Sequence, residues 1–152
     1  QDGQAHLYYA PTRIHTEFSN FKVSHLVRYA TSHKPASATN VLPSVALLTC
    51  YAGIEGALVD AVLSTKPDGL VLEGLGHGTI PKQVIEKTAN LDIPVVRASR
   101  TGSGLVSTVE SDKERGYLVS DSLQAQKARI LLMLCLVKGY DKDQIRQAFK
   151  EY

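Results

Sequence analysis

The sequence lacks an excess of charge of either sign, and it lacks a long apolar run. Its 152 residues carry 17 basic and 15 acidic side chains, for a formal net charge of +2. This balance gives no extended positive field of the kind that holds nucleic acid or an anionic membrane. The longest apolar run, residues 130–137, is far shorter than the roughly 20 residues of a membrane-spanning helix. We therefore expect a soluble chain with no nucleic-acid or membrane partner.

Cysteine is also scarce, because the chain has only Cys50 and Cys135. Both lie inside apolar stretches, where a thiol usually behaves as a small buried hydrophobic group. Two cysteines cannot form a metal cage unaided, and the five histidines show no metal-ligand spacing. We expect two buried structural thiols and no metal site.

A targeting signal is missing as well. The sequence begins at Gln1, without an initiator methionine and without the basic, apolar and small-residue regions of a signal peptide. We expect the chain to be a fragment, a processed product or an engineered piece. Its length and its 43% apolar content suit one domain with a real hydrophobic core.

From about residue 44 onward, short apolar runs alternate with longer stretches of helical period, which is typical of βαβ units around a parallel sheet. The pattern predicts strands at residues 45–51, 69–73, 93–99 and 117–120. It predicts helices at residues 55–64, 81–90, 123–138 and 141–152, with Thr79 as a candidate N-cap of the second and Asp141 or Asp143 of the last. We therefore expect an α/β fold: a small open parallel sheet of about four strands with flanking helices.

Two segments stand apart from this pattern. Residues 31–40 are rich in Ser, Thr, Ala and Pro, which favours a linker, and residues 3–9 resemble part of a hairpin. Residues 130–137 are apolar all round, so this half of a helix must be buried on more than one side. Another subunit is one candidate for the additional neighbour.

Ligands of an open parallel sheet gather at the carboxyl ends of the strands, here the turns at residues 51–55, 74–79 and 99–104. The second turn, Gly-Leu-Gly-His-Gly-Thr, resembles a dinucleotide-binding loop, but Thr79 replaces the last glycine and no Walker lysine follows. We therefore expect no nucleotide cofactor. The glycines of the turn at residues 74–79 indicate that something approaches its backbone closely, either a packed element or a ligand.

Other polar residues carry weaker signals. His77 is the only histidine on a strand-end turn, and Ser103 fails the nucleophile-elbow pattern because Thr101 replaces its first glycine. Arg97 and Arg100 flank the end of the third strand. We interpret the segment that follows as a polar loop with three carboxylates, Glu110, Asp112 and Glu114. One of these carboxylates could bind a ligand amine, or all three could be solvated. The sequence favours solvation, and we interpret residues 111–113 as surface.

Five segments, in order, resemble type II bacterial L-asparaginases and glutaminase-asparaginases: residues 11–16 (PTRIHT), 74–79 (GLGHGT), 97–104 (RASRTGSG), 120–123 (SDSL) and 128–134 (ARILLML). The similarity runs from about Tyr8 to Tyr152 and is more specific than any one motif. It implies the Rossmann-like C-terminal domain of that family. In domain terms, residues 1–19 would be the tail of a missing N-terminal domain, 20–43 the inter-domain linker and 44–152 the C-terminal domain.

The resemblance also implies an activity, hydrolysis of L-asparagine to L-aspartate and ammonia. The family's nucleophilic threonine, in a Thr-Gly-Gly-Thr-Ile segment, its second threonine and its lysine belong to the N-terminal domain and do not occur here. We therefore expect this chain alone to be inactive, with no catalytic residue of its own. The family needs no metal or organic cofactor.

The family's C-terminal domain supplies a polar residue on the Gly-rich turn and a glutamate after the Ser-Arg segment to a neighbouring subunit's site. Thr79 and Glu110 hold these positions, although the family has asparagine or serine where Thr79 stands. Glu114 competes with Glu110, whose implied role is to bind the substrate's α-ammonium group. The expected support of the site loops comes from Gly76, His77, Gly78 and Arg100.

The implied partners are a small-molecule substrate, L-asparagine and possibly L-glutamine, an asparaginase N-terminal domain, and further copies in a homo-oligomer. The type II resemblance implies a periplasmic or secreted location, with the cytoplasm left open. An alternative function is a non-catalytic binding or scaffolding module that kept the fold. A free-standing ligand binder that uses the Gly-rich turn is a weaker alternative.

Overall fold

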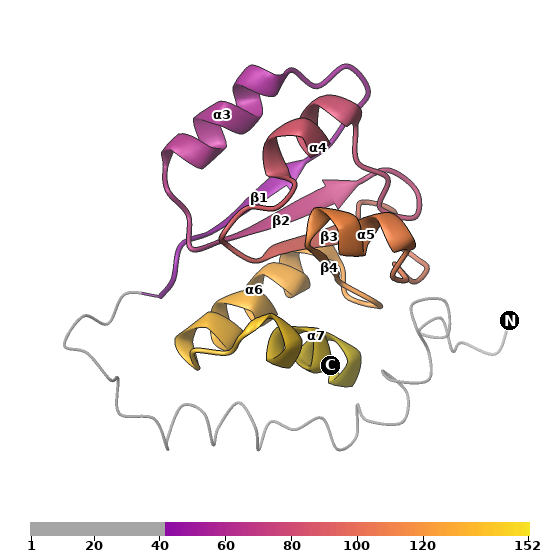
Figure 1. The fold of residues 1–152 in the computed structure, drawn as a ribbon. Helices are drawn as coiled ribbons and strands as arrows, with labels where there is room; N and C mark the ends of the chain where they lie inside the picture. The colour runs from indigo at the N-terminus through magenta and orange to yellow at the C-terminus, as the bar shows by residue number, and fades with distance from the viewer. Residues whose placement is uncertain (1–41) are drawn as a thin grey trace, which may run out of the picture. The chain divides into compact units, whose positions relative to one another are not determined.

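Four parallel strands form the centre of the part of the chain that the structure describes (Figure 1). The computed structural model describes residues 42–152. The strands are β1 (Val45–Thr49), β2 (Gly69–Gly74), β3 (Val95–Ser99) and β4 (Tyr117–Val119), and they lie in the order β1-β2-β3-β4. Each neighbouring pair is parallel. The predicted α/β class and its four-stranded parallel sheet are confirmed, while the expectations for residues 1–41 lie outside the described residues.

Strand β2 is buried along its whole length, as expected for a continuous apolar run between two covered faces. Strand β3 begins two residues later than its apolar run predicts. Pro94 lacks an N–H and cannot donate to a ladder, but its carbonyl accepts a hydrogen bond of 3.0 Å from the Leu70 N–H. The sheet therefore starts in register at Leu70 and Val95.

Helices cover both faces of the sheet (Figure 1). Helices α3 (Gly56–Ser64) and α4 (Lys82–Thr88) lie on one face, and α6 (Ala125–Val137) and α7 (Lys142–Glu151) lie on the other. The predicted ends of all four helices lie within two residues of the observed ends, which is the usual uncertainty of helix boundaries. A fifth helix, α5 (Glu110–Arg115), connects β3 to β4 where the sequence predicted a polar loop, so that prediction was wrong.

The two predicted helix caps have different outcomes. The Asp141 carboxylate accepts hydrogen bonds of 2.9 and 2.8 Å from the N–H groups of Asp143 and Gln144, so it caps α7 as predicted. Thr79 does not cap α4, because the N-cap is Pro81. The backbone of Thr79 is instead paired with Leu75 in the preceding turn.

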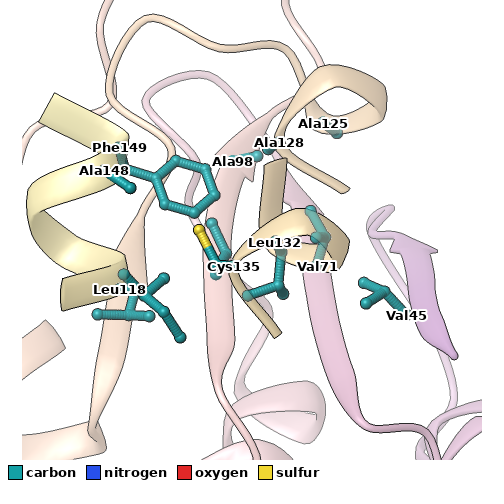
Figure 2. Close-up of a cluster of buried hydrophobic side chains, with 12 residues drawn as sticks. Val45, Val71, Ala98, Leu118, Ala125, Ala128, Leu132, Cys135, Ala148 and Phe149 are labelled. Atoms are coloured by element: carbon teal, nitrogen blue, oxygen red, sulfur yellow. The ribbon is translucent and has the colours of Figure 1, made fainter. Parts of the chain in front are cut away.

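Two apolar clusters hold the helices to the sheet. On the α3 and α4 face, Val59 and Val84 pack with the β2 side chains Leu70 and Leu72. On the opposite face, α6 and α7 bring Leu132, Cys135 and Phe149 against the strands, as Figure 2 shows. Both clusters contain fully buried side chains. Alternation along the strands thus assigns successive residues to opposite clusters.

The outer face of α6 keeps apolar side chains in solvent. Ile130 is 52% exposed and Val137 is 43% exposed, whereas Leu132 on the same helix is fully buried. Nothing within residues 42–152 covers this outer face, although its composition is that of a buried surface. The additional neighbour expected from the sequence therefore stays a prediction.

The expectation of buried structural thiols is confirmed. Cys50 and Cys135 are both free and buried. Burial, together with a smaller effect of the nearby Glu73 carboxylate, raises the pKa of Cys50 to about 11. Burial also raises the pKa of Cys135 to about 11, against a small opposing effect of Lys138. Both thiols stay protonated at neutral pH.

Leu132→Ala should lower the free energy of unfolding by about 2–5 kcal/mol, because it opens a cavity in the α6 cluster. Ile130→Ala is the matched control on the same helix. Its side chain is half exposed, so we expect a loss below about 1 kcal/mol. Urea unfolding followed by circular dichroism measures both, and equal losses would contradict the assignment of the buried face.

The thiols should react with a maleimide at about pH 8 at least ten-fold more slowly in the folded chain than in urea, because the thiolate is the reactive form. Since folding raises both pKa values, the associated stability is present below the unfolded pKa and is lost as the pH rises towards about 11. Labelling at equal rates in both states would show that the thiols are accessible.

Candidate functional site

The Gly-rich turn after β2 is a small closed loop at the carboxyl edge of the sheet. Leu75 and Thr79 exchange two backbone hydrogen bonds of 2.9 and 2.7 Å. Gly76 and Gly78 have φ angles of +51° and +78°, in the left-handed region that favours glycine. A Cβ at Gly74 would lie 2.5 Å from the Gly78 carbonyl carbon. A Cβ at Gly78 would lie 2.9 Å from Arg97 Nη1 and 3.0 Å from the Ala98 carbonyl oxygen. The close approach that the glycines indicated is therefore that of the turn to itself and of the turn to β3.

Arg97 ties this turn to helix α5. Its side chain points from β3 into the interior and is only 6% exposed. Nε and Nη2 each donate to one oxygen of the Asp112 carboxylate at 2.7 Å, in a bidentate pair. Nη1 donates to the His77 carbonyl at 2.6 Å. One guanidinium thus fixes a turn and a helix that lie far apart in the sequence.

The same guanidinium also holds the segment between these two elements. Its Nη2 donates to the Ser107 carbonyl at 2.9 Å. The Asp112 carboxylate in turn accepts the Val109 N–H at 2.9 Å, which satisfies a free N–H at the start of α5. The interpretation of residues 111–113 as surface was wrong for Asp112, which is completely buried because it neutralises a buried cation.

His77 makes a second connection between the turn and this segment. Its Nε2 lies 3.0 Å from the Ser107 N–H and 3.0 Å from the Ser107 hydroxyl oxygen. Since the N–H can only donate, Nε2 is the acceptor and carries no proton. Unlike Arg97, His77 is exposed. The sequence placed His77 on the right turn but gave no sign of its partner, 30 residues further on.

The loop after β3 is fixed to the turn as well. The Ser99 hydroxyl donates to the Gly76 carbonyl and accepts the Thr101 N–H at 3.1 Å. The Arg100 N–H donates to the Gly74 carbonyl at 3.0 Å, and its Nη1 reaches the Cys50 carbonyl at 3.4 Å. Arg100 therefore joins three strand ends while its side chain stays exposed.

The two residues singled out for substrate contact, Thr79 and Glu110, both lie on the surface. Thr79 ends the Gly-rich turn, and Glu110 is the first residue of α5. Glu110 forms an ion pair of 2.9 Å with Lys113, but both side chains are more than two-thirds exposed. Such a pair contributes little to stability and is easily exchanged. The structure thus connects their segments through Arg97 and His77, and it leaves both side chains accessible.

A cavity of about 140 Å³ lies between the loop that holds Ser107 and α7. Its lining includes Val106, Arg146 and Phe149, and neither Thr79 nor Glu110 lines it. Within residues 42–152, no three His, Cys, Asp or Glu residues lie together as metal ligands would, and no helix there is long and apolar enough to cross a membrane. The candidate site is the exposed surface formed by the ends of β2 and β3 and the start of α5.

Comparison with known protein families identifies this arrangement. The model of the glutaminase/asparaginase C-terminal domain matches residues 44–149, most of the chain. The chain belongs to the glutaminase/asparaginase C-terminal domain family. The resemblance seen in the sequence motifs is thereby confirmed, and the four-stranded sheet is that of an asparaginase C-terminal domain.

Similar proteins agree with this family. The chain is 35% identical over 145 residues to L-asparaginase 2 of Bacillus subtilis (strain 168), covering 93% of this chain and 35% of that protein. It is 33% identical over 147 residues to L-asparaginase 2 of Escherichia coli (strain K12), covering 93% and 38%. Glutaminase-asparaginase of Pseudomonas fluorescens biotype A is 24% identical over 157 residues, covering 99% and 40%. The chain spans little more than a third of these relatives.

In this asparaginase C-terminal domain, Asp112→Ala should lower the free energy of unfolding by about 3–5 kcal/mol, because it leaves the Arg97 guanidinium buried without its counter-charge. Glu110→Ala removes an exposed carboxylate from the same helix. We expect this control to change stability by less than about 1 kcal/mol. Urea unfolding measures both variants, and an unfolding midpoint of Asp112→Ala equal to that of Glu110→Ala would refute the central role of the buried pair.

Proposed function

We propose that this domain is part of an L-asparaginase and that Thr79 and Glu110 bind substrate in the site of a neighbouring subunit. One observation carries the proposal. Thr79 and Glu110, to which the resemblance assigns substrate contact, belong to the turn and the helix start that Arg97 joins within residues 42–152. A binding surface needs such a fixed spacing, because an oriented substrate must meet both groups at once.

The chemistry of the two side chains suits an α-amino acid. A carboxylate at Glu110 pairs with the substrate's α-ammonium group, which replaces the exposed Lys113 ammonium. The Thr79 hydroxyl donates and accepts one hydrogen bond, as the serine or asparagine of relatives can. Glu114, also exposed on α5, is the competing carboxylate.

Hydrolysis itself falls to the N-terminal domain in this proposal. A threonine there attacks the side-chain amide, ammonia leaves, and water releases aspartate from the acyl-enzyme. Positioned donors stabilise the oxyanion. Residues of this chain hold only the α-amino end of the substrate, so the domain alone is inactive. The resemblance implies that the reaction needs no cofactor.

Assembly follows from the exposed position of both residues. Thr79 and Glu110 are both exposed, and neither lines the cavity beside α7. In this proposal, a second protein surface covers the substrate that they hold. The apolar outer face of α6, with Ile130 and Val137, supports a homo-oligomer.

A periplasmic or secreted location is also part of the proposal. One relative, from Haemophilus influenzae, is named a probable periplasmic L-asparaginase.

The direct experiment adds purified asparaginase N-terminal domain to this chain and measures ammonia release from L-asparagine and L-glutamine. We expect release from the mixture and none from either part. A mixture that forms a complex and stays silent would favour a non-catalytic scaffolding module instead.

In the active mixture, Glu110→Gln should lower kcat/KM for L-asparagine by about 30- to 100-fold, because a charge-assisted contact to the α-ammonium group is lost. Glu114→Gln is the matched control, with an exposed carboxylate on the same helix. We expect it to stay within about two-fold of the unmodified chain, since exposed charges away from the substrate matter little. A larger loss for Glu114→Gln would move the substrate contact to that residue.

A further inference from the structure

The His77 side chain is the one exposed group that bridges the two substrate-facing segments within residues 42–152. Its Nε2 accepts the Ser107 N–H at 3.0 Å. His77 stands two residues before Thr79, and Ser107 stands three residues before Glu110. The ring therefore spans the gap between the turn that presents one side chain and the loop that leads to the other.

This contact adds to what Arg97 does in the interior. Arg97 binds the carbonyl groups of His77 and Ser107, which point inwards. The imidazole binds the N–H of Ser107, which those contacts leave unpaired. Both backbone polar groups of Ser107 are thus fixed to the same turn, one from the buried side and one from the exposed side. A loop held at both groups cannot rotate its peptide planes freely.

We propose that His77 is a positioning residue, which sets the place of Glu110 relative to Thr79 by holding Ser107, and so determines affinity for the substrate's α-ammonium group. We call the hydrogen bond from the Ser107 N–H to His77 Nε2 the brace. The brace is argued from the geometry alone, whereas the substrate in this proposal rests on the proposed function. His77 touches no reacting atom, so it acts on binding and leaves the acyl-transfer step unchanged.

The chemistry of the brace defines the test variants. Ser107 needs an acceptor at the distance of Nε2, which the side-chain carbonyl of glutamine also reaches. His77→Gln therefore preserves the brace, and His77→Leu removes it. Ser107→Ala deletes only the hydroxyl and keeps the N–H that donates to the ring. Because His77 is exposed, none of these variants opens a cavity.

The brace is measured first in the 152-residue chain, by hydrogen exchange of backbone amides. His77→Leu should speed exchange of the Ser107 amide by about five-fold or more, the effect of one net hydrogen bond. Amides of α6 should be unchanged, and His77→Gln and Ser107→Ala should stay near the unmodified chain. Unchanged exchange at Ser107 in His77→Leu would overturn the brace whatever the enzyme does.

The positioning role is measured in the enzyme assembled with the N-terminal domain. His77→Leu should raise KM for L-asparagine by about five-fold with kcat within about two-fold, and His77→Gln should restore KM. A purely structural role would lower the amount of active enzyme and leave KM unchanged. An active enzyme with unchanged KM in His77→Leu overturns the positioning role alone. A complex with no activity in the unmodified protein overturns the proposed function, and the substrate role of His77 with it.

Discussion

The buried pair of Arg97 and Asp112 is the interaction on which this end of the domain depends. Two buried ions lose several kcal/mol of hydration each, and only close geometry with further hydrogen bonds offsets that cost. Here the bidentate contact uses Nε and Nη2, and the remaining donors bind the His77 and Ser107 carbonyls. The pair therefore exists only when the Gly-rich turn, the Ser107 loop and α5 are all in place.

This dependence explains why a short polar helix forms at α5. Six residues without an apolar face have no reason to be helical in isolation, because helices this short are unstable in water. Asp112 supplies the missing stabilisation: its carboxylate binds Arg97 and also accepts the N–H of Val109 at the helix start. Glu110 is thereby fixed at the first position of a helix, although its own ion pair with Lys113 is exposed and weak.

The sequence predicted the parts of the fold that periodicity encodes. Strand β2 and helices α3 and α6 follow from apolar spacing, and the Asp141 cap follows from local hydrogen bonding. The placement of His77, Thr79 and Arg100 at the carboxyl edge follows from strand direction alone. Helix α5 and the burial of Asp112 could not be predicted this way, because both depend on a residue 15 positions earlier in the chain.

One signal for that pair was nevertheless present in the sequence. Arg97 stands on a strand between Val96 and Ala98, which both face a buried cluster. Alternation places Arg97 on the opposite face, which is also covered, so its charge had to find a buried partner. A cation inside an apolar strand thus predicts that a carboxylate will be buried, although it does not identify which of the three that follow.

The Gly-rich turn and the loop that holds Ser107 are connected twice, by Arg97 and by His77. The Arg97 connection stabilises the fold, whereas the His77 connection can change without loss of the fold. Arg97 lies in the interior and donates hydrogen bonds to several backbone carbonyls at once. A substitution there therefore leaves buried carbonyl groups without hydrogen-bond partners. His77 lies on the surface, where water replaces whatever contact a substitution removes. The spacing of an exposed binding surface can therefore be altered at position 77 with little effect on folding, whereas position 97 has to keep both its charge and its planar set of donors.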